Sequence, residues 1–229
     1  MTPSRTDAQH LYKEGTDRVG DQEEHLKQID PSALPGREAY HLLTGLIVPR
    51  PIAWVSTLSP SGIRNVAPHS YFNAISSAPL IVHFTSTGTK DSLVNSRATG
   101  EFVVNVVSRD LAEKMNLTAA NFPPEEDEFT WAGIESAPSV TVKAPRVAAA
   151  KAAFECRVVH IQELGNGSMV FGEVQLILVD PDVMRDGRVD PELLAPIGRL
   201  GGSTYTDAAK ALFDLKRPSY DDLKDQAPS

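Results

Sequence analysis

The chain has 229 residues, of which 41% are hydrophobic and 23% charged, which is ordinary for a globular protein with a sizeable core. Its formal net charge of -8 argues against the broad basic surface that nucleic acids and anionic membranes require, although a local basic site for a phosphate is still allowed. Cys156 is the only cysteine in the sequence, so the chain has no intrachain disulfide and no thiol-rich metal site.

The two ends of the chain are polar. The N-terminal segment lacks a basic-then-apolar signal pattern, and no apolar run approaches about 18 residues, so we expect a cytoplasmic protein with no membrane partner. From the negative net charge we expect no nucleic-acid partner. Residues 1–27 predict a flexible arm with one helical stretch at residues 21–28, and residues 219–229 a polar tail. The segment between them, residues 28–218, is predicted to be one domain.

The first half of this domain alternates short helices and strands. Residues 37–47 predict an amphipathic helix that ends before the Pro49-Arg50-Pro51 break. Turn residues separate two β-type runs, which predicts a hairpin of residues 52–58 and 63–67. Further strands are expected at residues 80–85 and 102–107, and helices at residues 90–99, ended by Gly100, and from an N-cap at Ser108 through Met115.

The second half is dominated by another hairpin. Residues 154–164 and 168–179 read as two strands turned by Asn166-Gly167, and a last short helix is expected at residues 207–213. At least six strands with few and brief helices indicate a mainly β protein, with a closed or split β-barrel and short helices at its rim.

Several polar groups stand at the ends of these strands. The Thr87-Gly88-Thr89-Lys90-Asp91-Ser92 loop combines a lysine with a helix N-terminus, which suits a phosphate. An ordinary capped helix with an exposed lysine would have the same sequence pattern. Ser56 and Thr57 end the first strand, and Asn65, opposite them, can both donate and accept hydrogen bonds, as the edge of a heterocycle requires.

The remaining candidates are weaker. His69 is a weak candidate for an acid or base, and a packing role is favoured because no nucleophile or carboxylate motif accompanies it. The acidic residues of the loop at 121–134 can be read as a metal or acid/base site, but a solvated loop is favoured, and the six histidines show no metal-ligand spacing. No catalytic residue is therefore assigned, and no metal is expected.

An ordered series of motifs resembles the flavin reductase-like family, whose fold is the FMN-binding split barrel with Greek-key-like connections. The series covers about residues 28–218 and consists of PRPIAWVSTLSPSGIRNVAPHSYFNAISSAPLIVHF, KDSLVN, GEFVVNVV, FECRVV, GEV and RLGGSTY. The resemblance implies a homodimer that binds FMN non-covalently near the subunit interface. Carried onto this sequence, the FMN-binding residues would be Ser56, Thr57, Asn65, Ala67, Pro68, His69, Ser70, Lys90, Asp91, Ser92, Asn95, Arg199, Gly201 and Tyr205.

The resemblance also implies an activity. We expect an NAD(P)H-dependent flavin reductase, in which NAD(P)H is a transient co-substrate and reduced flavin or electrons pass to an acceptor such as a monooxygenase. Two alternatives stay open: a flavoredoxin-like electron-transfer protein reduced by a protein partner, and a flavoenzyme that acts directly on a small organic substrate. At the position of His69 the relatives often carry an aromatic residue, so the histidine could alter the polarity around the ring or the choice of substrate.

Overall fold

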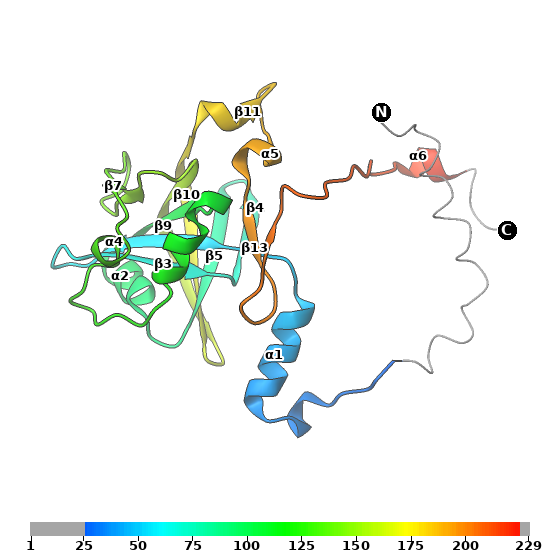
Figure 1. Ribbon diagram of the computed structural model, residues 1–229, viewed down its shortest axis with the longest axis horizontal. Helices are drawn as coiled ribbons and strands as arrows, with labels where there is room; N and C mark the ends of the chain where they lie inside the picture. The colour runs from blue at the N-terminus through cyan, green and yellow to red at the C-terminus, as the bar shows by residue number, and fades with distance from the viewer. Residues whose placement is uncertain (1–25, 225–229) are drawn as a thin grey trace. The chain divides into compact units, whose positions relative to one another are not determined.

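The computed structural model describes residues 26–224 (Figure 1). The chain divides into two compact units, Met1–Leu43 and Thr44–Ser229. The short helix η3 (Pro31–Ala33) precedes helix α1 (Gly36–Leu46), which confirms the helix predicted at residues 37–47. The predicted arm at residues 1–27 and the helical stretch at 21–28 lie almost wholly outside the described residues.

Seven antiparallel strands form the main sheet of the second unit (Figure 1). Their order across the sheet is β3-β2-β6-β9-β10-β5-β4. The strands are β2 (Ala53–Leu58), β3 (Arg64–His69), β4 (Phe72–Ser77), β5 (Leu80–Thr87), β6 (Glu101–Val106), β9 (Ala152–Leu164) and β10 (Gly167–Val179). The mainly β architecture and both hairpins are therefore as predicted.

Two features of this sheet differ from expectation. Strand β4 was not predicted, because its sequence, FNAISS, mixes apolar residues with Asn and Ser without regular alternation, and its strand character comes from pairing with β5. The turn between β9 and β10 consists of Gly165 and Asn166, not of Asn166 and Gly167. Gly165 adopts φ 58°, a conformation that glycine tolerates at the first turn position, whereas Gly167 pairs with Leu164 within the sheet.

The strands at the two ends of this order, β3 and β4, follow each other in the chain and are joined by Ser70 and Tyr71. The Thr85 N–H on β5 donates to the Tyr71 carbonyl at 2.8 Å, which ties this connection to the far end of the sheet. The sheet therefore curves back on itself, and the end of β3 comes close to β5. This curvature positions the site described below.

Short elements surround the sheet. The helices are α2 (Asp91–Thr99), η4 (Arg109–Leu111), α3 (Ala112–Leu117), α4 (Glu128–Trp131), η5 (Pro181–Val183), α5 (Pro191–Leu194) and α6 (Tyr220–Leu223). Small sheets are formed by β1 (Arg50–Pro51), β13 (Ile197–Arg199) and β14 (Tyr205–Asp207), by β7 (Ser136–Ala137) and β8 (Arg146–Val147), and by β11 (Met184–Arg185) and β12 (Arg188–Val189). No helix within residues 26–224 is long and apolar enough to cross a membrane.

Two of the predicted helices are corrected. The helix expected from Ser108 begins as the 3-10 helix η4 and becomes α-helical only in α3, and the Ser108 hydroxyl bonds the Asp110 carboxylate instead of capping the helix. The helix expected at residues 207–213 is absent from the described chain. Asp207 ends β14 and its carboxylate accepts from the Ala209 N–H at 3.2 Å, while Ala211 adopts φ 60°, which a helix cannot contain.

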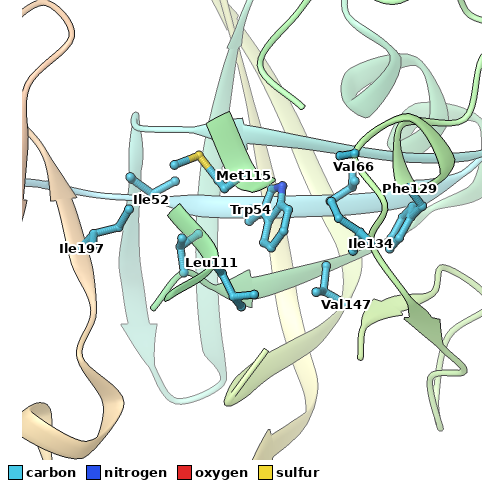
Figure 2. Close-up of a cluster of buried hydrophobic side chains, with 11 residues drawn as sticks. Ile52, Trp54, Val66, Leu111, Met115, Phe129, Ile134, Val147 and Ile197 are labelled. Carbon is cyan, nitrogen blue, oxygen red and sulfur yellow. The ribbon is translucent and has the colours of Figure 1, made fainter. Parts of the chain in front are cut away.

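The core lies on both faces of β2, because successive side chains of a strand point to opposite sides. Trp54 belongs to the cluster drawn in Figure 2, which gathers side chains from β2, β3, α3 and α4. Ala53 and Val55, its neighbours in the strand, pack in a second cluster with Phe84 and Phe102. Strand β2 is thus buried from Ala53 to Thr57, and this buried strand carries the polar groups near its end.

Candidate functional site

A cavity of about 340 Å³ lies beside β3 and the N-terminus of α2. This volume is within the range of small-molecule sites. The chain supplies its wall from β3, from the start of α2, from the segment that follows α3, and from α4. The lining residues are Asn65, Ala67, Pro68, Thr89, Lys90, Asp91, Ser92, Thr118, Ala119, Ala120, Asn121, Phe122, Pro124 and Glu128.

Helix α2 presents an uncapped N-terminus to this cavity. Its N-cap residue is Lys90, whose extended backbone (φ -119°, ψ 158°) begins the helix and whose side chain makes no capping hydrogen bond. Within residues 26–224 no carboxylate forms an ion pair with the exposed Lys90 ammonium group. Free N–H groups, the positive end of the helix dipole and an unpaired cation together suit an anion.

A buried hydrogen-bond network stands behind this helix end. Thr57 and Asn65 are cross-strand partners, and the Thr57 hydroxyl donates to Asn65 Oδ1 at 3.2 Å. The Asn95 amide donates to Thr57 Oγ1 at 3.0 Å, and Ser92 Oγ lies 3.3 Å from Asn65 Oδ1. The network joins β2 and β3 to two turns of α2, so it fixes the helix N-terminus against the sheet.

His69 belongs to the same network and is buried. Its Nδ1 lies 3.3 Å from the Thr85 carbonyl, and its Nε2 lies 3.1 Å from Ser92 Oγ. Because a carbonyl can only accept, Nδ1 carries the proton of the neutral ring, and Nε2 is left to accept from the Ser92 hydroxyl. Burial, assisted by the positive charge of Lys90, lowers the pKa of His69 to about 4. At neutral pH His69 is therefore an uncharged group that orients Ser92.

Glu128 is a residue that the sequence reasoning missed. The acidic loop was expected to be solvated, but Glu128, at the first position of α4, is 4% exposed and lines the cavity. Its Oε1 accepts from Asn65 Nδ2 at 2.6 Å, and burial raises its pKa. A signal was present in the sequence, because Asp127 is a typical N-cap residue and the large apolar Phe129 follows it two positions later. In the structure Asp127 caps α4 by accepting from the Thr130 N–H, and Phe129 is fully buried.

The structure brings together most of the predicted site residues but separates Ser56 from Thr57. The two hydroxyls point to opposite faces of β2, and Ser56 Oγ donates to the Pro145 carbonyl at 2.5 Å and accepts from Asn105 Nδ2 at 3.0 Å. Ser70 lies outside the cavity and accepts a long hydrogen bond, 3.4 Å, from Arg50 Nε. The strand period of two thus places the two adjacent hydroxyls in different surroundings, and a flavin-binding role for Ser56 and Ser70 stays a prediction.

Arg199, Gly201 and Tyr205 form a separate group in this chain and do not line the cavity. The Arg199 guanidinium lies over the Tyr205 ring, 4.5 Å from its centroid, and donates to the Tyr205 hydroxyl. Tyr205 lines a second cavity, of about 540 Å³, between α3 and β14. A flavin-binding role for these three residues therefore stays a prediction. Among residues 26–224 no cluster of His, Cys, Asp and Glu side chains is arranged to hold a metal ion.

The chain is similar in sequence and in fold to proteins of one family. Residues 45–194 match the family model described as "Flavin reductase like domain". The chain is similar to nitrilotriacetate monooxygenase component B of Bacillus cereus, with 32% identity and a TM-score of 0.80 over 83% of this chain and 98% of that one. It is similar to the 2-nitrobenzoate 2-nitroreductase of Pseudomonas fluorescens, with 33% identity and a TM-score of 0.80 over 89% of this chain and 99% of that one.

A more distant structure bears on the fold. A split-barrel protein of Shewanella frigidimarina shares 22% identity and superposes with a TM-score of 0.74 over 86% of this chain and 98% of that one. Together with the seven-stranded antiparallel sheet, this similarity confirms the predicted split barrel.

Proposed function

Because the chain belongs to the flavin reductase-like family, we propose that it is an NAD(P)H-dependent flavin reductase that binds FMN non-covalently in the cavity beside α2. The observation that carries the proposal is the unpaired Lys90 at the uncapped N-terminus of α2, which offers a site for the FMN phosphate. Reduced flavin, or its electrons, would then pass to an acceptor such as a monooxygenase. The B. cereus monooxygenase component is a relative consistent with that role.

The residues present fit FMN. Lys90 and the backbone N–H groups of Asp91 and Ser92 would hold the phosphate, and Asn65 would present polar atoms to the rest of the ligand. Bound FMN would supply the hydride-accepting chemistry that no side chain provides. The chain's own part is orientation: His69 positions Ser92, and the contacts of Ser92 with Asn65 and of Asn95 with Thr57 hold α2 against the sheet.

A homodimer is part of the proposal. Strands β4, β5, β9 and β10 carry large apolar side chains that are about half exposed, namely Ile75, Leu80, Val159 and Ile177. A shallow cavity of about 370 Å³ on these strands is lined almost entirely by apolar atoms. Exposed apolar patches of this kind mark interaction surfaces. A second copy would also be a means of bringing Arg199, Gly201 and Tyr205 to a flavin, since they do not line the cavity of their own chain.

The proposed activity is tested by anaerobic absorption spectroscopy of the purified protein with FMN, to which NADH and then NADPH is added. Rapid bleaching of the flavin band at catalytic protein concentrations is the expected result, and the faster nucleotide identifies the donor. Bound flavin that neither nucleotide bleaches would contradict a reductase and favour electron transfer from a protein partner. Failure to bind flavin would contradict the proposal as a whole.

A second candidate is favoured by the similarity to the nitroreductase. That relative covers 89% of this chain at 33% identity, and its name describes direct reduction of an aromatic nitro compound. The same cavity would then admit a small organic substrate beside the bound flavin. Consumption of 2-nitrobenzoate by the protein with FMN and NADH or NADPH, at a rate above that of free reduced flavin, would support this candidate over the first.

A further inference from the structure

Glu128 is a carboxyl group with one oxygen engaged and one left over. Oε1 accepts from Asn65 Nδ2, whereas Oε2 is buried and has no hydrogen-bond partner among the described residues. A buried carboxylate oxygen without a partner is costly when charged, and protonation removes most of that cost. If the group takes up a proton, Oε2 receives it, because Oε1 is already an acceptor.

The charges that face Glu128 come from three elements. On α2, Asp91 lines the same cavity and its negative charge raises the pKa of Glu128, while Lys90 supplies the cation at the cavity wall. On β3, Arg64 pairs with Asp127 at 2.6 Å, so these two charges cancel locally. His69, also on β3, is neutral because burial lowers its pKa to about 4.

The carboxylates of the loop before α4 complete this environment. Glu126 accepts from the Trp131 indole at 2.7 Å and does not line the cavity. The pKa of Asp91 is raised mainly by its burial and, to a smaller extent, by the negative charge of Glu125. Among the residues that the structure describes, the cavity lining therefore carries one cation, Lys90, and two carboxyl groups, Asp91 and Glu128, so the entry of a dianion makes a charged Glu128 more costly.

We propose that Glu128 takes up a proton when a phosphorylated flavin enters the cavity, so that anion binding at the N-terminus of α2 is coupled to neutralisation of the Glu128 carboxyl. This inference rests on the proposed function, since it takes FMN as the ligand. The physical reason is charge: a phosphate of charge about -2 near α2 disfavours a second negative group in the same cavity. The proton comes from solvent, and the net change is up to one proton bound per FMN.

The burial of Glu128 strengthens the coupling. The carboxyl is 4% exposed, so solvent does not screen it from the ligand, whereas the Lys90 ammonium is exposed and its charge is screened. Several donors oppose protonation, namely the backbone N–H groups of Glu128 and Val66 and the amide of Asn65. Desolvation outweighs them, because it is the largest influence on this pKa.

The test is calorimetric titration of FMN into the purified full-length protein, in two buffers of different ionisation enthalpy and between pH 5.5 and pH 8. The difference between the buffers gives the protons taken up per FMN. Wild type is expected to take up more protons per FMN than Glu128→Gln, and the difference should approach one proton in part of this pH range. As the pH rises, the ratio of the wild-type FMN dissociation constant to that of the variant should increase by up to about tenfold per pH unit. The protonation of FMN's own phosphate is common to both proteins and cancels in the comparison.

Glu135→Gln is the matched control. Glu135 is exposed and lies outside the cavity, so its substitution removes the same charge without touching the site and should leave the proton uptake of wild type unchanged. Riboflavin supplies a second measurement that needs no variant: it lacks the phosphate, and wild type should take up fewer protons on binding it than on binding FMN.

The outcomes separate the two proposals. If FMN binds with the same proton uptake in wild type and Glu128→Gln, or if riboflavin and FMN give equal uptake in wild type, the coupling is overturned while the proposed function stands. If wild type binds no flavin, the proposed function fails and takes the coupling with it. If Glu128→Gln does not fold, the riboflavin comparison decides at pH 8, where the phosphate of free FMN, with a second pKa of about 6, is already ionised and has no proton to release.

Discussion

The Nε2 atom of His69 lies 3.1 Å from the hydroxyl oxygen of Ser92, and this contact joins the last residue of β3 to the first turn of α2. Since Nδ1 faces the Thr85 carbonyl, both ring nitrogens are engaged when the ring is neutral. Protonation of His69 would place a charge in a buried site, near the Lys90 cation, and would reverse the direction of the hydrogen bond to Ser92.

Stability should therefore fall in mild acid because of His69. Its pKa is 6.5 when unfolded and about 4 in the folded chain, so between these values the unfolded state binds more protons and stability rises with pH. The contribution is fully present above pH 6.5 and is lost as the pH falls towards 4, by up to about 3 kcal/mol. Urea denaturation of wild type and His69→Phe at pH 5 and pH 7.5 checks it.

The comparison of the two proteins isolates this effect from the other titrating groups. Glu128, for example, has a raised pKa and acts with the opposite sign, since its contribution is lost as the pH rises. The loss between pH 7.5 and pH 5 should be larger in wild type than in His69→Phe. An equal loss in both would mean that His69 titrates in the folded chain as it does in the unfolded one.

Lys90→Ala should weaken FMN binding by about 1–3 kcal/mol, the scale of a hydrogen bond to a charged group. The reason is that Lys90 is the cation of the cavity wall and has no competing ion pair within residues 26–224. Fluorescence titration should show the loss for FMN and little change for riboflavin, which has no phosphate.

The matched control for this prediction is Lys210→Ala. The Lys210 side chain is 81% exposed and, among the described residues, pairs only with Asp207, so its removal makes the same change in net charge away from the cavity. It should leave FMN affinity within about twofold, since exposed distant charges are screened. Unchanged FMN affinity in Lys90→Ala, or an equal loss for riboflavin, would rule out the phosphate assignment.

Part of the site follows from the sequence because it depends on local rules. The turn at residues 59–62 sets the hairpin register, which places Thr57 opposite Asn65. Gly100 ends α2 in the left-handed conformation (φ 71°), as the glycine after a helical segment predicts. These local features predict the cavity's two main walls, β3 and the start of α2.

The rest depends on long-range packing that the sequence does not display. Glu128 is buried because α4 packs beside β3 and aligns its carboxyl with Asn65, 63 residues away in the chain. Strand β4 exists because β5 pairs with it. The separation of Ser56 from Thr57 is an exception, since it follows from the strand period of two alone, which places neighbouring side chains on opposite faces.

Gly172→Ala should destabilise the fold. A Cβ at this position would lie 2.3 Å and 2.5 Å from two ring carbons of Phe102, which is fully buried between Phe84 and Cys156. Because the buried Phe102 ring packs edge-on against Phe84, with ring centroids 5.1 Å apart, moving it disturbs other core side chains, and we expect a loss of about 1–3 kcal/mol. Gly45→Ala in α1 is the control: its Cβ meets nothing within 4 Å, and it should raise stability by up to about 1 kcal/mol. A neutral Gly172→Ala in urea denaturation would show that Phe102 can shift.

Thr118→Val should destabilise the protein through Trp54. The Trp54 indole N–H, fully buried, donates to Thr118 Oγ1 at 2.9 Å, and that hydroxyl donates in turn to the Met115 carbonyl at 2.7 Å. Valine keeps the shape but leaves the indole N–H without an acceptor, which costs about 1–3 kcal/mol. Urea denaturation measures the loss.

Thr118→Ser separates the hydrogen bond from the packing of the methyl group. Serine keeps the hydroxyl that accepts from Trp54, so it should retain most of the stability that valine loses. Thr118 also lines the candidate cavity, so both variants should be compared for FMN affinity at equal folded fraction. If serine destabilises the chain and valine does not, the methyl contact and not the indole hydrogen bond holds this wall of the cavity in place.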